Sequence, residues 1–266
     1  MKRILFNILK VIIGLYVLLC VGFYIFQEKI IFVPETLEKS HQFDFGQNFE
    51  ERNFKTADGK LINGLLFKAD SAKGLIFYIH GNAGSLNGWG NAGKTYTKLN
   101  YDVFILDFRG YGKSEGKITS QEQLFEDNQM VYDALTKEYD EKEIIVLGYS
   151  IGSGMASFLA SENSPKRLIL QAPYYSLTNL QRQMFPFIPS FTLRYKLATN
   201  EYLKNCNMPV TIIHGNEDAV IPYESSLRLK EEFKSKVNLI ILDGVGHNEL
   251  TTNADYIKAI KTVLEK

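Results

Sequence analysis

The pattern Gly-x-Ser-x-Gly occurs at residues 148–152 and contains Ser150. An apolar run precedes it and a run of small residues follows it, which predicts a strand, a sharp turn and a helix. A serine hydroxyl is a weak nucleophile, so it needs a base to remove its proton and N–H groups to stabilise an oxyanion. A sharp turn would expose the hydroxyl to both, and Ser150 is therefore the candidate nucleophile.

Two further loops could supply a base and an acid to Ser150. His247 follows two glycines in the loop after the last predicted strand, and these glycines leave the ring free to reach the serine. Asp218 lies in an earlier loop and is the candidate acid that would orient and support the base. Its neighbour Glu217 is the alternative, because the direction of a loop side chain cannot be read from sequence. The chain order serine, aspartate, histidine is expected for a triad on an α/β sheet.

The glycine-rich segment His-Gly-Asn-Ala-Gly at residues 80–84 could direct a backbone N–H at an oxyanion. We expect the N–H groups of Asn82 and of Ile151, which follows the candidate nucleophile, to form the oxyanion hole. His80 is assigned a structural role, because a histidine at the end of a buried strand more often holds a loop by hydrogen bonds. The glycine-rich turn at residues 107–114 is likewise assigned no catalytic task.

These loops require a sheet that brings the ends of several strands together. From residue 74 onward, apolar runs alternate with helical runs, which predicts a parallel sheet with crossover helices. Two earlier runs, 49–56 and 61–67, flank a turn and predict an antiparallel hairpin. Together they predict an eight-stranded doubly wound sheet with its ligand site at the carboxyl ends of the strands. The remaining predicted strands are 74–79, 103–106, 143–147, 167–170, 210–213 and 239–242, and the predicted helices are 121–139, 151–161, 223–233 and 254–264.

Residues 174–207 form a segment that is longer than a simple crossover between two strands and rich in aromatic residues. Its position predicts a small helical cap over the site, and its apolar composition favours an acyl or aryl ligand. Packing of the same aromatic residues onto the sheet explains the composition equally well. Trp89, shortly after the oxyanion segment, is expected to edge the same pocket, with core packing as the alternative.

Residues 1–30 are expected to form a membrane anchor. No residue between positions 11 and 26 is charged, and this apolar stretch is about long enough to cross a ~30 Å hydrocarbon layer. No small-residue cleavage site follows it, and Leu19 stands before Cys20 where a lipoprotein signal requires a small residue. The positive charges at the start of the chain outweigh Lys29, so the N-terminus is expected in the cytoplasm and the globular part on the extracytoplasmic side.

The chain has 266 residues and a formal net charge of zero, which fits one large domain and a short extra segment. We expect a connector at residues 31–48 and the catalytic domain at residues 49–266. Without a basic excess, nucleic acid is not an expected partner. The two cysteines lie in different parts of the chain, so neither an intradomain disulfide nor a cysteine zinc site is expected. No metal or organic cofactor is implied, and no oligomeric state is predicted.

Taken together, the motifs resemble those of serine hydrolases of the α/β-hydrolase superfamily, in particular the membrane-anchored bud-emergence-type hydrolases and the related ABHD proteins. The resemblance implies an α/β-hydrolase fold with Ser150 as nucleophile, Asp218 as acid and His247 as base. Tyr174 and Tyr175 stand where similar proteins often carry a smaller pair, so Tyr174 is expected to shape the binding pocket. The resembling segments are Ile-Phe-Val-Pro at 31–34, His-Gly-Asn-Ala-Gly at 80–84, Asp-Phe-Arg-Gly-Tyr-Gly-Lys-Ser at 107–114, Gly-Tyr-Ser-Ile-Gly at 148–152 and His-Gly-Asn-Glu-Asp at 214–218.

The predicted reaction is a two-step acyl transfer that hydrolyses carboxylic esters or thioesters of lipid-like or acylated substrates. A serine at the sharp turn argues against dehalogenase and epoxide hydrolase chemistry, for which an aspartate nucleophile is expected. Two alternatives remain: a serine peptidase or amidase on the same fold, and a catalytically idle, membrane-tethered binding protein. The presence of serine, acid and base together favours an enzyme.

Overall fold

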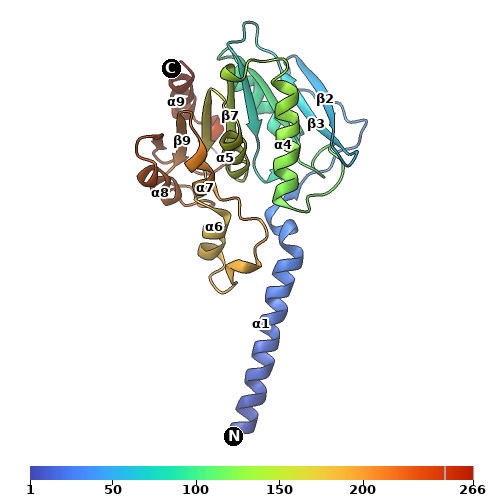
Figure 1. The fold of residues 1–266 in the computed structure, drawn as a ribbon, viewed down its shortest axis with the longest axis vertical. Coiled ribbons are helices and arrows are strands. Elements are labelled where there is room, and N and C mark those ends of the chain that lie inside the picture. The colour runs from blue at the N-terminus through green and yellow to red at the C-terminus, as the bar shows by residue number, and fades with distance from the viewer. Residues whose placement is uncertain (249, 266) are drawn as a thin grey trace.

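The structure is a computed structural model that describes residues 1–248 and 250–265 of the chain. Its centre is an eight-stranded sheet with the order β10-β9-β8-β7-β4-β6-β3-β2. A long N-terminal helix extends away from the sheet, and the C-terminus lies at the opposite end of the molecule (Figure 1). The predicted doubly wound sheet is therefore confirmed.

Strand direction in the sheet follows the predicted division of the chain. Strands β2 (Phe49–Lys55) and β3 (Leu61–Phe67) form an antiparallel hairpin, and β3 also pairs antiparallel with β6. The other pairings in this sheet are parallel. Among the strands paired in parallel, all but the partly exposed edge strand β10 are covered on both faces, which explains their nearly continuous apolar sequences. The strands paired in parallel are β4 (Leu75–Ile79), β6 (Asp102–Leu106), β7 (Ile144–Tyr149), β8 (Arg167–Gln171), β9 (Val210–Gly215) and β10 (Val237–Leu242).

Helices cover both faces of the sheet and bury one apolar cluster on each side. Alternate residues of β4 point to opposite faces: Phe77 joins the cluster that includes α4 and α5, and Tyr78 joins the cluster that includes α3 and α9. Ser120 caps α4, since its hydroxyl accepts a 3.1 Å hydrogen bond from the N–H of Gln123. The helices outside the cap are α2 (Leu86–Trp89), α3 (Gly93–Thr97), α4 (Gln121–Leu135), α5 (Gly152–Glu162), α8 (Glu224–Glu232) and α9 (Ala254–Leu264), with 3₁₀ turns η1 (Gly90–Ala92), η2 (Glu141–Glu143) and η4 (Leu250–Thr252).

The N-terminal helix α1 (Lys2–Ile31) is long and apolar enough to cross a membrane. It ends at Phe32, whose backbone is extended. The next residues form β1 (Val33–Pro34), which pairs in parallel with β5 (Ala83–Gly84). The end of α1 is thus joined directly to the glycine-rich segment at residues 80–84.

The chain between β8 and β9 carries the helices α6 (Leu177–Met184) and α7 (Thr199–Asn205), with the 3₁₀ turn η3 (Ser190–Thr192) between them. In Figure 1, α6 lies beside the part of α1 nearest the sheet, and the rings of Phe23 and Phe185 make the contact with centroids 6.0 Å apart. This helical segment occupies the place in the chain where the sequence predicts a cap.

Candidate active site

Ser150 lies on a sharp bend between β7 and α5. Its φ of 54° is in the left-handed region, which costs energy for a residue with a side chain. The flanking glycines are required by space: a Cβ on Gly148 would lie 2.5 Å from that of Ala156, and one on Gly152 would lie 2.2 Å from the carbonyl oxygen of Ile79. The bend therefore has the strained form that the Gly-x-Ser-x-Gly pattern predicts.

The structure brings together the three predicted side chains Ser150, His247 and Asp218. The Oγ of Ser150 lies 3.0 Å from Nε2 of His247, and Nδ1 of the same ring lies 2.6 Å from Oδ2 of Asp218. All three residues are buried. Glu217, the alternative acid, is exposed, and the carboxylate that contacts the histidine is that of Asp218.

The carboxylate of Asp218 is held on both oxygens. Oδ1 accepts hydrogen bonds of 2.8 Å from the N–H groups of Val220 and Ile221, and Oδ2 lies 3.1 Å from Nε2 of His214 as well as contacting His247. Burial alone would raise the pKa of Asp218, but hydrogen bonds from the two histidines and from the Ile221 amide hold it well below its usual range. The acid therefore stays ionised beside the imidazole at neutral pH.

His214 is a site residue that the sequence analysis did not identify. Its Nδ1 lies 2.7 Å from the hydroxyl of Ser226, and its other nitrogen lies beside Asp218. The ring thus connects α8 to the acid and fixes the direction of the carboxylate. The sequence feature that could have identified His214 is its position at the end of β9, four residues before the acid.

Tyr149, the residue before the candidate nucleophile, is a second unpredicted neighbour. Its hydroxyl donates a 2.5 Å hydrogen bond to the backbone carbonyl of His247, and the two rings pack with centroids 5.3 Å apart. Burial, followed by the nearby charge of Asp218, raises the pKa of Tyr149, so the hydroxyl keeps its proton and remains a donor. Tyr149 therefore positions the loop that carries the candidate base.

The two predicted oxyanion donors, Asn82 and Ile151, line the same cavity as Ser150. Within the described part of the chain, neither backbone N–H donates a hydrogen bond to another residue. The carbonyl of Asn82 is held by Tyr111, whose hydroxyl donates to it at 2.6 Å, and by the N–H of Val33 at 3.0 Å. Both residues thus lie at the cavity with backbone amides that have no acceptor among the described residues.

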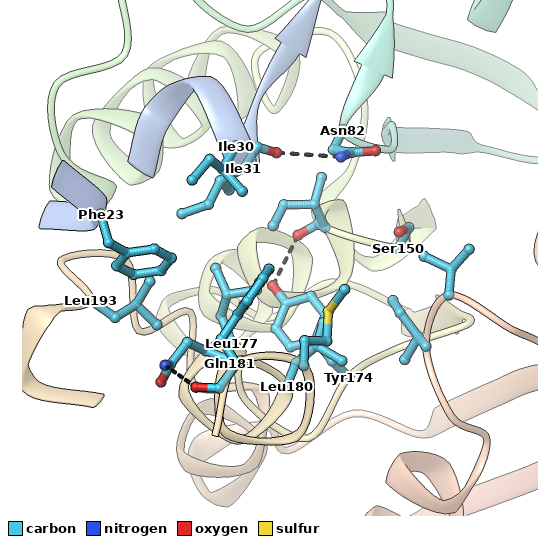
Figure 2. A pocket seen from close by; sticks show the side chains of 15 residues that line it. Phe23, Ile30, Ile31, Asn82, Ser150, Tyr174, Leu177, Leu180, Gln181 and Leu193 are labelled. Carbon is cyan, nitrogen blue, oxygen red and sulfur yellow. Dashed lines mark hydrogen bonds between the residues drawn. The ribbon is translucent and has the colours of Figure 1, made fainter. Parts of the chain in front are cut away.

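An apolar cavity of about 190 Å³ lies over Ser150. Figure 2 shows its walls: the end of α1 on one side and the cap helix α6 on another. Tyr174 lines it as predicted, and its hydroxyl donates a 3.0 Å hydrogen bond to the carbonyl of Ile151. The lining residues are Phe23, Ile30, Ile31, Asn82, Ser150, Ile151, Tyr174, Leu177, Leu180, Gln181, Met184, Phe185, Leu193, Val220 and Ile221.

The expectation that Trp89 edges the binding pocket is wrong, because Trp89 is not among the residues that line this cavity. Its indole stacks on His80 with centroids 5.6 Å apart and packs against Tyr149 at 5.3 Å. Its Nε1 donates a 2.8 Å hydrogen bond to the carbonyl of Ala83. The ring therefore supports the loops beneath the serine bend, which is the core-packing alternative.

The two segments given structural roles have such roles in the structure. The buried His80 ring packs on Phe108 with centroids 4.2 Å apart, and Asp107 accepts a 3.0 Å hydrogen bond from the N–H of Leu86. Arg109 pairs with Asp127 at 2.6 Å and also with a carboxylate of the hairpin turn. These contacts hold the loops in place.

Across residues 1–248 and 250–265, no group of three or more histidine, cysteine, aspartate or glutamate side chains could hold a metal ion. Cys20 and Cys206 are both free. Burial raises the pKa of the Cys206 thiol to about 12, so this side chain is protonated and is not a reactive thiolate.

Comparisons with known proteins agree with this geometry. Residues 70–201 match the Hydrolase_4 family, described as serine aminopeptidase, S33. The chain is 30% identical to alpha/beta hydrolase domain-containing protein 17B of Xenopus laevis over 72% of its own length and 66% of the relative's. It is 28% identical to the human protein of the same name over 85% of its own length and 81% of the relative's.

Solved structures share the fold. An esterase of Pyrococcus furiosus, Pf2001, superposes with a TM-score of 0.68 at 21% identity, covering 88% of this chain and 96% of the esterase. Est1E of Butyrivibrio proteoclasticus, in a structure with ferulic acid bound, superposes with a TM-score of 0.65 at 19% identity, covering 79% of this chain and 95% of that one. These findings support a hydrolase of the serine type. The chain belongs to the α/β-hydrolase superfamily, within its group of α/β-hydrolase domain-containing (ABHD) proteins.

Proposed function

We propose that this protein is a membrane-anchored serine hydrolase that cleaves carboxylic ester or thioester bonds in lipid-like or acylated substrates. The observation that carries the proposal is the hydrogen-bonded series from Ser150 through His247 to Asp218, which opens onto an apolar cavity. Serine, base and acid in this arrangement perform acyl transfer on several unrelated folds.

In the first step, Nε2 of His247 removes the proton of the Ser150 hydroxyl while the oxygen attacks the carbonyl carbon of the substrate. The N–H groups of Asn82 and Ile151 stabilise the oxyanion that forms. The intermediate then collapses: the bond to the alcohol or thiol breaks, and that leaving group takes the proton from the imidazolium. The serine now carries the acyl group as an ester.

In the second step, water replaces the alcohol or thiol. The same imidazole removes a proton from the water as its oxygen attacks the acyl-enzyme, and it returns the proton to the serine oxygen as the acid leaves. Asp218 keeps Nδ1 of His247 protonated, so that Nε2 is free to accept a proton, and it stabilises the charged ring. Since the pKa of Asp218 lies well below its usual range, the acid performs this role throughout the neutral range.

The cavity supports an acyl group as the part of the substrate that binds beside Ser150. No described residue that lines it is charged, and most of the lining side chains are aliphatic or aromatic. An aminopeptidase must bind the positively charged amino group of its substrate, and this cavity offers no carboxylate for it. Esters and thioesters with apolar acyl groups therefore fit the site better than peptides with a free amino terminus.

Helix α1 supports the membrane part of the proposal, since it is long and apolar enough to span a bilayer. We place the N-terminus in the cytoplasm and the catalytic domain on the extracytoplasmic side, because the positive charges cluster at the start of the chain. Protease treatment of sealed vesicles or spheroplasts tests this orientation. Protection of the catalytic domain in spheroplasts would reverse it.

Labelling with a fluorophosphonate tests the enzyme proposal. The wild type should be labelled, and Ser150→Ala should lose the label and at least about 10⁴-fold of its activity on esters and thioesters. Ser161→Ala is the matched control, because it removes a half-buried hydroxyl from the helix that follows the bend. A folded wild type that takes no label would instead favour the binding-protein alternative. Equal rates on matched esters and amides would favour the peptidase or amidase alternative.

A further inference from the structure

The cap carries an exposed apolar tip at residues 184–191, between α6 and the end of η3. This cap tip contains no charged residue. Phe187 and Phe191 are 81% and 86% exposed, and the side chains of Met184 and Phe185 are also exposed. Large apolar side chains gathered in this way on a protein surface mark a site that contacts another apolar phase or a partner.

The cap tip lies against the candidate membrane helix. The hydroxyl of Tyr16 donates a 2.8 Å hydrogen bond to the carbonyl of Phe187, and Phe23 packs on Phe185. At a rise of about 1.5 Å per residue, Tyr16 lies about 22 Å along α1 from its end at Ile31. If α1 crosses a bilayer, the cap tip therefore lies at the depth of the lipid acyl chains. The groove between the two is lined by Tyr16, Val17, Cys20, Val21, Tyr24, Pro189, Phe191 and Thr192.

A set of polar contacts fixes the depth of the cap tip relative to α1. Gln27 donates a 3.1 Å hydrogen bond to the carbonyl of Thr192 and accepts one of 2.7 Å from the N–H of Arg194. Arg194 also pairs with Glu28, which accepts a 3.0 Å hydrogen bond from the hydroxyl of Tyr195. These contacts form one polar level at the junction of the helix and the cap, and Arg182 donates a 2.9 Å hydrogen bond to the hydroxyl of Ser190 within the cap tip. This is the arrangement that a membrane surface requires of two elements that enter it together.

The backbone of the cap tip is also suited to an apolar environment, where unpaired carbonyls are costly. The amide of Gln181 donates to the carbonyls of Ile188 at 2.8 Å and Phe185 at 3.3 Å, and the carbonyl of Phe187 accepts from Tyr16. The two prolines in this segment carry no N–H to satisfy. These features reduce the cost of removing the cap tip from water.

The cavity over Ser150 reaches the same surface. Met184 and Phe185 line the cavity and are also exposed, while Phe23 lines it from the opposite side on α1. At about 190 Å³, the cavity is smaller than the roughly 300–1,000 Å³ that encloses a drug-sized ligand. A long acyl chain would therefore extend out of the cavity between the cap tip and the helix.

From these observations we infer that the cap tip inserts into the lipid bilayer beside α1, and that acyl chains enter the cavity directly from the membrane. The partner of this surface is the acyl-chain region of the lipid bilayer. The entry route rests on the proposed function, whereas insertion of the cap tip does not require catalysis. The two parts therefore need separate measurements.

Insertion is tested with the full-length chain in vesicles whose lipids carry bromine on the acyl chains, which quench nearby tryptophan. The chain has one tryptophan, Trp89, which supplies the same background in every variant. Phe187→Trp should add a fluorescence component that the brominated lipids quench at least about twofold relative to ordinary lipids. The matched control is Leu227→Trp on α8, which is 43% exposed and should add an unquenched component. Equal quenching of the two variants, or none in either, would overturn insertion.

Entry is tested in the same vesicles with a double variant, Phe187→Asp with Phe191→Asp, and with Leu227→Asp as control. The double variant should hydrolyse a long-chain ester embedded in the vesicles at least about tenfold more slowly, while its rate on a soluble short-chain ester and its fluorophosphonate labelling stay within about twofold. An unchanged long-chain rate would overturn the entry route. A wild type inactive on every ester would contradict the proposed function alone, because quenching reports insertion without catalysis.

Discussion

The two sides of the cavity are built differently. On the sheet side, the polar groups of Asp218 and His247 are held by several hydrogen bonds, and the serine lies on a bend that tolerates only glycine at two neighbouring positions. On the other side, α1 and the cap line the cavity with apolar side chains, several of them exposed. From this contrast we expect the sheet side to set the reactivity, and the cap and the helix to set the choice of acyl group in the proposed reaction. Substitutions on the two sides should therefore change different kinetic constants.

The acid offers the strongest test of the sheet side. Asp218→Asn should lower kcat by about 10⁴-fold, since the amide no longer enforces the required tautomer of His247. Glu217→Gln should stay within about twofold, because Glu217 is exposed. Steady-state kinetics of both variants with one ester measures the difference. A larger loss in Glu217→Gln would assign the acid to Glu217.

A substitution on the cap side should act on substrate choice. Leu180 lines the cavity from α6, and Leu180→Trp would fill part of its volume. We expect kcat/KM to fall about tenfold for long acyl chains, while kcat for an acetyl ester stays nearly unchanged. A series of p-nitrophenyl esters of increasing chain length measures this. An equal loss at every length would show that the two sides are not independent.

Tyr149 allows a finer test, because its hydroxyl bonds to the backbone carbonyl of His247 and not to the imidazole ring. Tyr149→Phe removes the hydrogen bond to the carbonyl of His247, a contact of the kind worth about 1 kcal/mol. We expect kcat to fall about fivefold, with little change in the KM of esters of any chain length. A change in KM alone would mean that Tyr149 shapes substrate binding.

The ionised carboxylate of Asp218 should also make a small, pH-dependent contribution to the free energy of unfolding. Because the pKa of Asp218 is lowered in the folded protein, the unfolded chain takes up the proton first as the pH falls through about 4. The stability that this carboxylate contributes is therefore complete above that range and declines below it. Denaturant unfolding measures the free energy of unfolding of the wild type and of Asp218→Asn. The difference between these two free energies should become smaller from pH 6 to pH 3. A constant difference would contradict the lowered pKa.

The sheet and the bend at Ser150 could be predicted because their causes are local in sequence. Each parallel strand except the edge strand β10 is an apolar run buried on both faces, and the glycines beside Ser150 are fixed by contacts that any such bend must make. Asp218 and His247 could be nominated from loops that follow strands. The choice between Asp218 and Glu217 needed coordinates, because a one-residue step in a loop reverses the direction of a side chain.

Two of the missed features depend on contacts between distant parts of the chain, whereas the missed His214 contacts Asp218 only four positions away. Tyr149 reaches a carbonyl 98 positions away, and Tyr16 reaches Phe187 across 171 positions. No local pattern reports such pairs. Trp89 was placed at the pocket because it follows the oxyanion segment, but its ring turns toward His80 instead. The packing partners of Trp89 come from three different strands or loops, and the positions of these partners determine where its ring lies.

In the proposed membrane-anchored protein, the short pairing of β1 with β5 would couple the lipid environment to the reacting centre. Val33, just beyond the end of α1, donates to the carbonyl of Asn82, and Asn82 in turn reaches back to the carbonyl of Ile31 at 3.4 Å. A spanning helix changes its tilt when the hydrocarbon thickness does not match its apolar length. Such a tilt would displace the peptide group of Asn82, which is proposed to hold the oxyanion. The turnover number should therefore depend on the thickness of the bilayer.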